Sequence, residues 1–316
     1  MILVISHAHD PHALDVIERM RARGAPVRLF DTGRFPRETR LSISHDREGW
    51  TARLFDNGED YDLAAVRAVW WRRPQPFDVD AAIVGAADRG FALAEAAAAI
   101  SGLWALLDAE WVNDPERDER AARKAWQLRV ARECGLSIPR TLITNDPAQA
   151  RAFVAAEEQQ LIYKAFQGSE EVWRETRILR ADEHALLDAV RHAPVIFQQF
   201  VPAVADLRLT IVGERIFAAA IDSSATRYPV DFRMDMAAAR ITEAHLPEHV
   251  SAALLRLMAR LGLFYGAIDM RLTPDGEHVF LEINPAGQWL FVELATGLPI
   301  SDALAAHLIS LASPSA

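Results

Sequence analysis

Two segments near the C-terminus carry polar side chains in an alternating pattern that could bind a divalent cation. The first contains Asp269 and Arg271, and the second contains Glu282 and Asn284. Side chains of a strand alternate between its faces, so the two members of each pair share a face. Carboxylate and amide oxygens are hard ligands that suit Mg²⁺, which also takes water and substrate phosphates. The pattern predicts a magnesium site, with an exposed, solvated polar strand as the alternative.

The residues around these four support a pair of neighbouring strands. The sequence Thr273-Pro274-Asp275-Gly276 between the two segments is a turn signal, so we expect a hairpin. Apolar residues occupy the alternate positions Ile268, Met270, Leu281 and Ile283. The polar face is therefore patterned, and one sheet surface would gather two acids, an amide and an arginine.

Lysine occurs only at positions 124 and 164, although the chain has 34 basic residues. This bias favours two sites that need a compact ammonium, such as one that binds a phosphate. The alternative is that two solvated lysines survive by chance, which suits Lys124 better than Lys164 in its apolar segment. No Walker sequence occurs, and no Gly-x-Gly-x-x-Gly follows the first predicted strand. A nucleotide would therefore be held by separate residues.

Three further segments carry residues that could bind a ligand. Residues 195–202 are apolar and end in a proline, so they could offer backbone groups to an adenine or form a buried strand. Asp206 and Arg208 repeat the same-face spacing of an acid and an arginine. Arg72 and Arg73 follow two tryptophans at a strand end, which favours a solvated tip over a grip on carboxylates.

Composition and length limit the class of protein. A chain of 316 residues fits two or three domains. Its net charge of −10 argues against a nucleic-acid partner. The single cysteine, Cys134, excludes internal disulfides and is interpreted as a small buried apolar residue. No targeting segment is visible, and the longest uncharged apolar run, 96–107, is too short for a membrane span, so we expect a cytoplasmic protein.

The predicted elements give an α/β fold that becomes α+β in its C-terminal part. Residues 2–30 read as strand, helix and strand, which predicts a parallel, right-handed unit, and a long helix at 80–107 would cover the sheet. A single helix is predicted from about 113 to Cys134, carrying Lys124. After 202 the chain is rich in strands, with a polar loop through Arg240, a helix at 247–261 and the hairpin.

These parts resemble the ATP-grasp ligases. The resemblance over 113–300 rests on Lys124, Tyr163-Lys164, residues 198–201, Asp206-Leu207-Arg208, Asp269 and Glu282-Ile283-Asn284. The subgroup most similar is the graspetide, or microviridin-type, ligases. That similarity adds Ser6-His7, Phe30-Asp31-Thr32, Phe35-Pro36, Trp71-Arg72-Arg73-Pro74, Ile221-Asp222-Ser223, Asp231-Phe232-Arg233 and residues 284–289. It implies an ATP-grasp fold with a Rossmann-like pre-ATP-grasp domain at 1–112, a central subdomain at 113–201 and a C-terminal subdomain at 202–316.

The resemblance also implies roles for individual residues. Lys124 and Lys164 would hold the phosphates of ATP. Gln198, Gln199 and Val201 would surround the adenine, and Asp206 would reach the ribose. Asp269, Glu282 and Asn284 would bind Mg²⁺, while Arg208 and Arg271 would face the reacting phosphate and carboxylate. Arg72, Arg73 and Arg233 are candidate substrate contacts. The loop after Lys164 departs from the family, since Gly168 is its only glycine and it carries Glu170 and Glu171.

The implied function is an ATP- and Mg²⁺-dependent ligase. It would activate side-chain carboxylates of a ribosomal precursor peptide, leader plus core, as acyl phosphates and form macrocyclic esters or amides. We expect a cytoplasmic homodimer without a nucleic-acid or membrane partner. One alternative is an ATP-grasp ligase that joins free amino acids or adds them to a protein tail. Another is a nucleotide-binding regulator without turnover, which the intact set Asp269, Glu282 and Asn284 disfavours.

Overall fold

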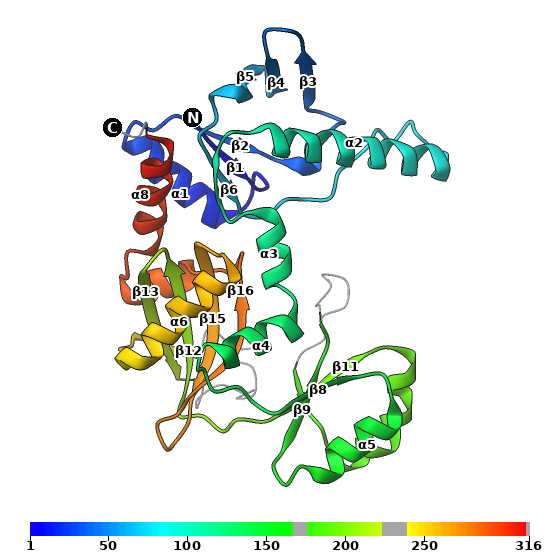
Figure 1. Ribbon diagram of the computed structural model, residues 1–316, viewed down its shortest axis with the longest axis vertical. Helices are drawn as coiled ribbons and strands as arrows, with labels where there is room; N and C mark the ends of the chain where they lie inside the picture. The colour runs from blue at the N-terminus through cyan, green and yellow to red at the C-terminus, as the bar shows by residue number, and fades with distance from the viewer. Residues whose placement is uncertain (167–175, 223–238, 314–316) are drawn as a thin grey trace. The chain divides into compact units, whose positions relative to one another are not determined.

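The computed structural model describes residues 1–166, 176–222 and 239–313 (Figure 1). The chain forms two compact units: Met1–Pro115 together with Pro299–Ala316, and Glu116–Leu298. The boundary near 115 lies close to the predicted one at 112. Residues 299–316 belong to the first unit, whereas the sequence had placed them with the C-terminal subdomain. The predicted division of the second unit at 201 stays a prediction.

The first unit contains a parallel sheet in the order β2-β1-β6-β7. Its strands are β1 (Ile2–Ile5), β2 (Val27–Phe30), β6 (Ala68–Trp71) and β7 (Glu110–Val112). Helix α1 (Pro11–Ala22) connects β1 and β2, and Asp10 caps it by accepting a hydrogen bond from the His12 amide. The predicted strand–helix–strand unit with parallel strands is therefore confirmed.

The rest of this unit comprises a small antiparallel sheet, two helices and two short 3₁₀ turns. These elements are η1 (Thr32–Arg34), β3 (Arg40–His45), β4 (Trp50–Asp56), β5 (Glu59–Asp62), η2 (Leu63–Ala65), α2 (Ala86–Leu106) and α8 (Ile300–Ala312). Helix α8 packs on α1, where Arg19 and Arg23 both pair with Asp302. None of the helices in the described ranges has the length and apolar composition needed to cross a bilayer.

The smaller sheet of the second unit has four antiparallel strands in the order β10-β9-β11-β8. Its strands are β8 (Thr141–Thr144), β9 (Leu161–Lys164), β10 (Arg177–Ile178) and β11 (Val195–Gln199). Helices α5 (Pro147–Ala156) and η3 (Ala181–His192), a 3₁₀ helix, pack against Tyr163 and Phe197 on one face. Lys164 and Gln198 alternate with these two residues, so they share the opposite face.

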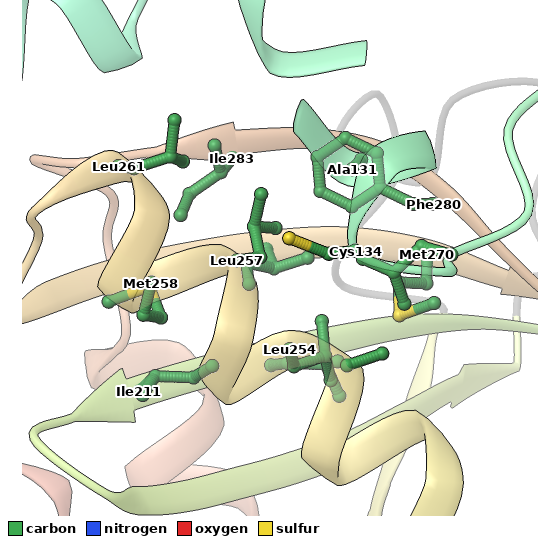
Figure 2. Packing of buried hydrophobic residues seen from close by; sticks show 14 of the residues in the cluster. Ala131, Cys134, Ile211, Leu254, Leu257, Met258, Leu261, Met270, Phe280 and Ile283 are labelled. Atoms are coloured by element: carbon green, nitrogen blue, oxygen red, sulfur yellow. The ribbon is translucent and has the colours of Figure 1, made fainter. Parts of the chain in front are cut away.

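The larger sheet of this unit has five antiparallel strands in the order β14-β13-β12-β15-β16. They are β12 (Ala205–Val212), β13 (Arg215–Asp222), β14 (Arg240–Glu243), β15 (Tyr265–Leu272) and β16 (His278–Asn284). One face packs on α4 (Lys124–Glu133) and α6 (Glu248–Leu261). Leu254, Leu257, Met258 and Leu261 of α6 follow helical spacing and interlock with residues of the sheet (Figure 2).

This core leaves the other sheet face to polar residues. Cys134 lies in the core at 5 % exposure, as its interpretation as a small apolar residue predicted, and burial raises the pKa of its thiol. On the opposite face, β12 and β15 present Asp206, Arg208, Asp269 and Arg271 in direct pairs. The α4–α6 layer therefore fixes the back of the sheet that carries the candidate site.

The predicted single helix from 113 to 134 is wrong. The chain forms α3 (Pro115–Ala121) and then α4, because Arg123 adopts an extended conformation with φ −74° and ψ 111°. The side chain of Gln127 compensates for the break, because its Nε2 donates to the Ala121 carbonyl at 2.6 Å. The break places Lys124 at the first residue of α4. A strand that was not predicted begins at the last residue of the predicted polar loop, since Arg240–Glu243 forms β14. Helix α7 (Leu290–Thr296) follows the hairpin.

Candidate nucleotide and metal site

Three strands bring two carboxylates and an arginine together. Asp269 of β15 lies opposite Arg208 on β12 and opposite Glu282 on β16. Arg208 Nη1 donates to Asp269 Oδ1 at 2.8 Å. A bulge between Asp269 and Met270 skips Leu281, so the register changes on one side of this group. The predicted hairpin is present, and it brings Asp269 and Glu282 opposite each other.

Helix α4 adds a lysine to the two carboxylates. Lys124 Nζ lies 2.9 Å from Glu282 Oε2, and each side chain is 22 % exposed. The first turn of α4 contains no acidic residue. Because the first amides of a helix point outward and carry partial positive charge, this end of α4 favours an anion. Lys124 and the helix terminus thus form a positive counterpart to the carboxylates.

Gln127 fixes this helix end against β16. Its Nε2 donates to the carbonyls of Ala121 at 2.6 Å and Ile283 at 2.7 Å, and its Oε1 accepts from the Ile283 amide at 3.3 Å. The side chain is 1 % exposed. The sequence did not single out this residue as part of the site. Its signal was a polar residue on the buried side of α4, where Val130 and Ala131 are apolar.

Arg208 is a buried cation with further contacts. Its Nη2 donates to the Gln288 carbonyl at 2.7 Å, and its guanidinium lies 5.8 Å from the ring of Phe291. Burial, the largest single influence, would lower the pKa of Arg208, but the charge and hydrogen bond of Asp269, together with Tyr265 and Glu282, raise it overall, so the group stays protonated. In the part of the chain that the structure describes, the buried Nε has no hydrogen-bond partner. A phosphate or carboxylate oxygen would satisfy it.

The segment after β16 closes over the sheet and depends on a glycine. A Cβ at Gly287 would lie 2.3 Å from Ala267 Cβ and 3.0 Å from Arg208 Nη2, so no larger residue fits without movement. The Tyr265 hydroxyl donates to the Gly287 carbonyl at 2.8 Å. Gly287 belongs to the segment 284–289 that carries the family resemblance, which did not predict this close approach.

Asn284 lies at the end of β16, opposite Ala267, and is exposed. Its Oδ1 accepts a hydrogen bond from the Ala286 amide at 3.0 Å. No three or more His, Cys, Asp or Glu side chains gather as a metal site within the described residues. The predicted set has only two carboxylates and one amide, so phosphate and water would complete its shell. That incomplete oxygen set fits Mg²⁺.

Arg271 and Asp206 form a second ion pair beside the first. Arg271 Nε donates to Asp206 Oδ1 at 2.9 Å, and its Nη1 donates to the Val201 carbonyl at 2.8 Å. Its guanidinium lies 5.1 Å from the centre of the Phe200 ring. Arg271 and Asp206 are both buried. The pair therefore fastens the connection between the two sheets, and contact of these residues with phosphate or ribose stays a prediction.

The predicted adenine residues lie along β11 and the connection that follows. Gln198 is buried, and its Nε2 donates to Thr141 Oγ1 at 2.8 Å. Gln199 points its side chain towards Gln159 and the Arg140 amide, and its own amide donates to the Arg140 carbonyl at 2.9 Å. The side chains of Gln198 and Gln199 thus make hydrogen bonds within the protein, and their contact with adenine stays a prediction.

The prediction of a solvated tip at Arg72 and Arg73, after β6, is wrong for Arg72. Arg72 is not solvated, because it is 1 % exposed and its Nε lies 3.1 Å from Asp10 Oδ2. Burial raises the pKa of Asp10, but Arg72 and the Ser6 hydroxyl outweigh it and the pKa is lowered. Arg72 thus stabilises the N-terminus of α1, and its burial speaks against a direct substrate contact. Arg73 is partly exposed.

Several predicted residues lie outside the described ranges. These are Arg233, its neighbours Asp231 and Phe232, Ser223, and the loop residues Gly168, Glu170 and Glu171.

Comparison with known proteins identifies the family. Residues 1–119 match the MvdD pre-ATP-grasp domain. The fold is similar to the macrocyclase MdnC bound with precursor peptide MdnA from Microcystis aeruginosa MRC, at 31 % identity and a TM-score of 0.87, covering 98 % of this chain and 99 % of that chain. No curated protein matches the sequence.

Two further solved structures are similar over nearly their full length. A Chryseobacterium gregarium RiPP-associated ATP-grasp ligase in complex with ADP and a leader and core peptide has 27 % identity and a TM-score of 0.90, covering 98 % of this chain and 96 % of that chain. The ATP-grasp ligase PsnB, complexed with minimal precursor, Mg and ADP, has 27 % identity and a TM-score of 0.80, covering 99 % and 97 %. The predicted ATP-grasp fold with a pre-ATP-grasp domain is confirmed, and the chain belongs to the ATP-grasp ligases of the graspetide type, the family that includes the macrocyclase MdnC.

Proposed function

We propose that this protein uses ATP to activate side-chain carboxylates of a ribosomal precursor peptide and joins them to hydroxyl or amino side chains of the same peptide. The products are macrocyclic esters or amides. One observation carries the proposal. In a chain related to peptide macrocyclases, Asp269 and Glu282 lie opposite each other, and they pair with Arg208 and Lys124. This arrangement of charges suits a triphosphate with its divalent cation.

The chemistry requires ATP because a free carboxylate is a poor acyl donor. A carboxylate oxygen of the peptide attacks the γ-phosphorus of ATP, the bond from that phosphorus to ADP breaks, and an acyl phosphate forms. A hydroxyl or amine then attacks the acyl carbon and loses its proton, and phosphate leaves. Such phosphoryl transfer depends mainly on positioning and charge neutralisation, so we expect no covalent enzyme intermediate.

The residues of the site divide these tasks. Asp269, Glu282 and Asn284 would hold Mg²⁺, which supplies positive charge against the transferring phosphate. Arg208 offers its buried Nε to the reacting phosphate or carboxylate. Lys124 and Lys164 hold phosphates. Gln198, Gln199 and Val201 line the adenine side, with Asp206 towards the ribose. Arg271 supports the reaction by holding neighbouring residues in place, since it hydrogen-bonds Asp206 and the Val201 carbonyl.

The proposed partner is a peptide with a leader and a core segment. This follows from the relatives, since MdnC is bound with its precursor peptide and the Chryseobacterium ligase with a leader and a core peptide. Arg73 and Arg233 remain candidate contacts for the acidic side chains of such a peptide. The net charge of −10 disfavours nucleic acid. A homodimeric assembly and a cytoplasmic location are proposed with it.

The test combines the protein, ATP, Mg²⁺ and a Glu/Asp- and Thr-rich peptide encoded beside its gene. Mass spectrometry should show the loss of one water for each ADP formed. Asp269→Asn should reduce this turnover by roughly 10²–10³-fold, whereas Asp275→Asn, at an exposed turn position, should not. A gain in peptide mass by an added amino acid would favour the alternative ligase reaction. Nucleotide binding without ADP formation would favour a regulator.

A further inference from the structure

Each of the two carboxylates proposed to bind a metal already has a cation of the chain beside it. Arg208 pairs with Asp269 at 2.8 Å, and Lys124 pairs with Glu282 at 2.9 Å. A divalent cation at these oxygens would place two further positive charges next to the arginine and the lysine. At least one of the resident cations must therefore move or gain an anionic partner, since like charges at such distances repel.

The two resident cations differ in how firmly they are held. Arg208 is 8 % exposed and has a second anchor at the Gln288 carbonyl, 2.7 Å away. Lys124 is 22 % exposed and ends a flexible four-carbon stem. A partly exposed ion pair of this kind contributes modest net free energy, so its partners can exchange at low cost. Lys124 is thus the cation that can leave.

The backbone around Lys124 is fixed, so only its side chain needs to move. Gln127, one turn further along α4, hydrogen-bonds both backbone groups of Ile283, the neighbour of Glu282. The start of α4 and the strand that carries Glu282 therefore keep their spacing. A phosphate at the N-terminus of α4 would lie within reach of Lys124 by rotation of its side chain, because both belong to the same helix turn.

We propose that Lys124 is an internal counter-ion that occupies Glu282 until a nucleotide phosphate takes it over. While the pair is intact, Lys124 weakens the binding of a divalent cation by itself. When a phosphate draws Lys124 away, Glu282 is released to the cation, so the cation binds with the nucleotide and not before it. This inference rests on the proposed function, and it requires that nucleotide and cation strengthen each other's binding through Lys124.

The first experiment measures Mn²⁺ binding to the full-length protein without nucleotide, by electron paramagnetic resonance. Mn²⁺ takes the same oxygen ligands as Mg²⁺. Lys124→Met and Lys124→Gln should bind Mn²⁺ roughly tenfold more tightly than the wild type, because the competing ammonium is gone. Arg123→Met, which removes an equal charge from the next residue and its exposed pair with Glu119, should leave the affinity unchanged. Circular dichroism verifies folding.

The second experiment uses the wild-type protein, in which only two lysines exist. With ¹³C-labelled lysine, the Lys124 signal is the one that Lys124→Met or Lys124→Gln removes. It should shift when ADP is added without any divalent cation, because the phosphates replace Glu282 as its partner. The enhancement of Mn²⁺ affinity by ADP should also be roughly tenfold smaller in Lys124→Met than in the wild type.

The outcomes separate this inference from the function on which it rests. Folded Lys124 variants that bind Mn²⁺ no more tightly than the wild type would overturn the inference, while the ligase proposal would stand if the wild type still binds ADP with Mn²⁺. A Lys124 signal that does not respond to ADP would do the same. Failure of the wild type to bind ADP in the presence of Mn²⁺ would overturn both.

Discussion

The side chain of Gln127 hydrogen-bonds the amide and the carbonyl of Ile283, 156 residues away. Among the described residues β16 is the edge strand of the large sheet, and on its outer side the Phe280 amide donates to the Ser137 carbonyl. At Ile283, the residue between Glu282 and Asn284, the side-chain amide of Gln127 makes the hydrogen bonds that a neighbouring strand would otherwise make. It thereby fixes the helix that carries Lys124 and the strand that carries the proposed metal ligands in one register.

Gln127→Leu should lower both stability and nucleotide affinity. The substitution leaves buried backbone groups of Ile283 and Ala121 without partners, and each unsatisfied group costs about 1–3 kcal/mol. We therefore expect the free energy of unfolding in urea to fall by roughly 3 kcal/mol or more. Arg129→Ala, on the exposed side of α4, should change it by about 1 kcal/mol or less, since it loses an exposed pair with Glu133 and a cation–π contact with Trp126. Equal stability of the two variants would contradict the role of Gln127.

Arg208→Lys should strongly reduce turnover although the charge is retained. A lysine cannot contact Asp269 and the Gln288 carbonyl at the same time, and it has no counterpart of the Nε donor. Loss of one group that stabilises the transition state typically costs on the order of 10²–10³-fold in rate. Peptide-dependent ADP release measures the effect. Arg215→Lys, at the exposed start of β13, is the matched control and should keep normal turnover.

The Arg271–Asp206 pair predicts a different kinetic result. Because Arg271 holds Asp206, the Val201 carbonyl and the Phe200 ring, its loss should loosen the connection that follows β11. Arg271→Lys should therefore raise KM for ATP more than it lowers kcat. Asp206→Asn should have a similar effect, and the double variant should be less impaired than the sum of the two. A drop in kcat alone would instead place Arg271 at the reacting phosphate, as the family resemblance implied.

Local signals in the sequence predicted a large part of the fold. Residues 273–276 form the predicted turn between β15 and β16, and Asp10 and Asp146 cap helices, because these hydrogen bonds join residues close in sequence. The break before Lys124 was not predictable, since the side chain that stabilises it also needs Ile283 from a distant strand. The strands β5 and β14 were missed because they are polar and mostly exposed, and β7 because it has only three residues.

The site was predicted in its components and not in its pairings. Alternation placed Asp269 with Arg271 and Glu282 with Asn284, which is a property of single strands. Which cation faces which carboxylate depends on the register among β12, β15 and β16, including the bulge that skips Leu281. The burial of Arg72 was not predicted because its partner, Asp10, precedes another element, helix α1. The neighbouring Trp71 packs edge to face on Trp104 of α2, which is also distant in sequence.

Gly287→Ala should reduce stability and turnover together. The added Cβ would meet Ala267 Cβ at 2.3 Å and approach Arg208 Nη2 to 3.0 Å, so the segment after β16 must move away from the sheet. Overpacking of this kind typically costs about 1–3 kcal/mol. Gly90→Ala, in α2 with no atom near the new Cβ, should instead stabilise by up to about 1 kcal/mol. Thermal unfolding and ADP release would compare the two, and similar shifts in both variants would argue against the close approach.

Acid should destabilise the first unit through His307 of α8. Burial lowers the pKa of His307 from 6.5 to about 4, so the folded state disfavours its protonation. A group whose pKa is lowered on folding adds stability above its unfolded pKa and loses it as pH falls through the folded value. The free energy of unfolding should therefore decline between pH 6.5 and about 4. Five of the eight tryptophans, at 50, 70, 71, 104 and 111, lie in this unit, so their fluorescence reports it. His307→Leu should remove much of the decline, whereas His245→Gln, at an exposed position, should retain it. An identical pH profile for wild type and His307→Leu would show that another group is responsible.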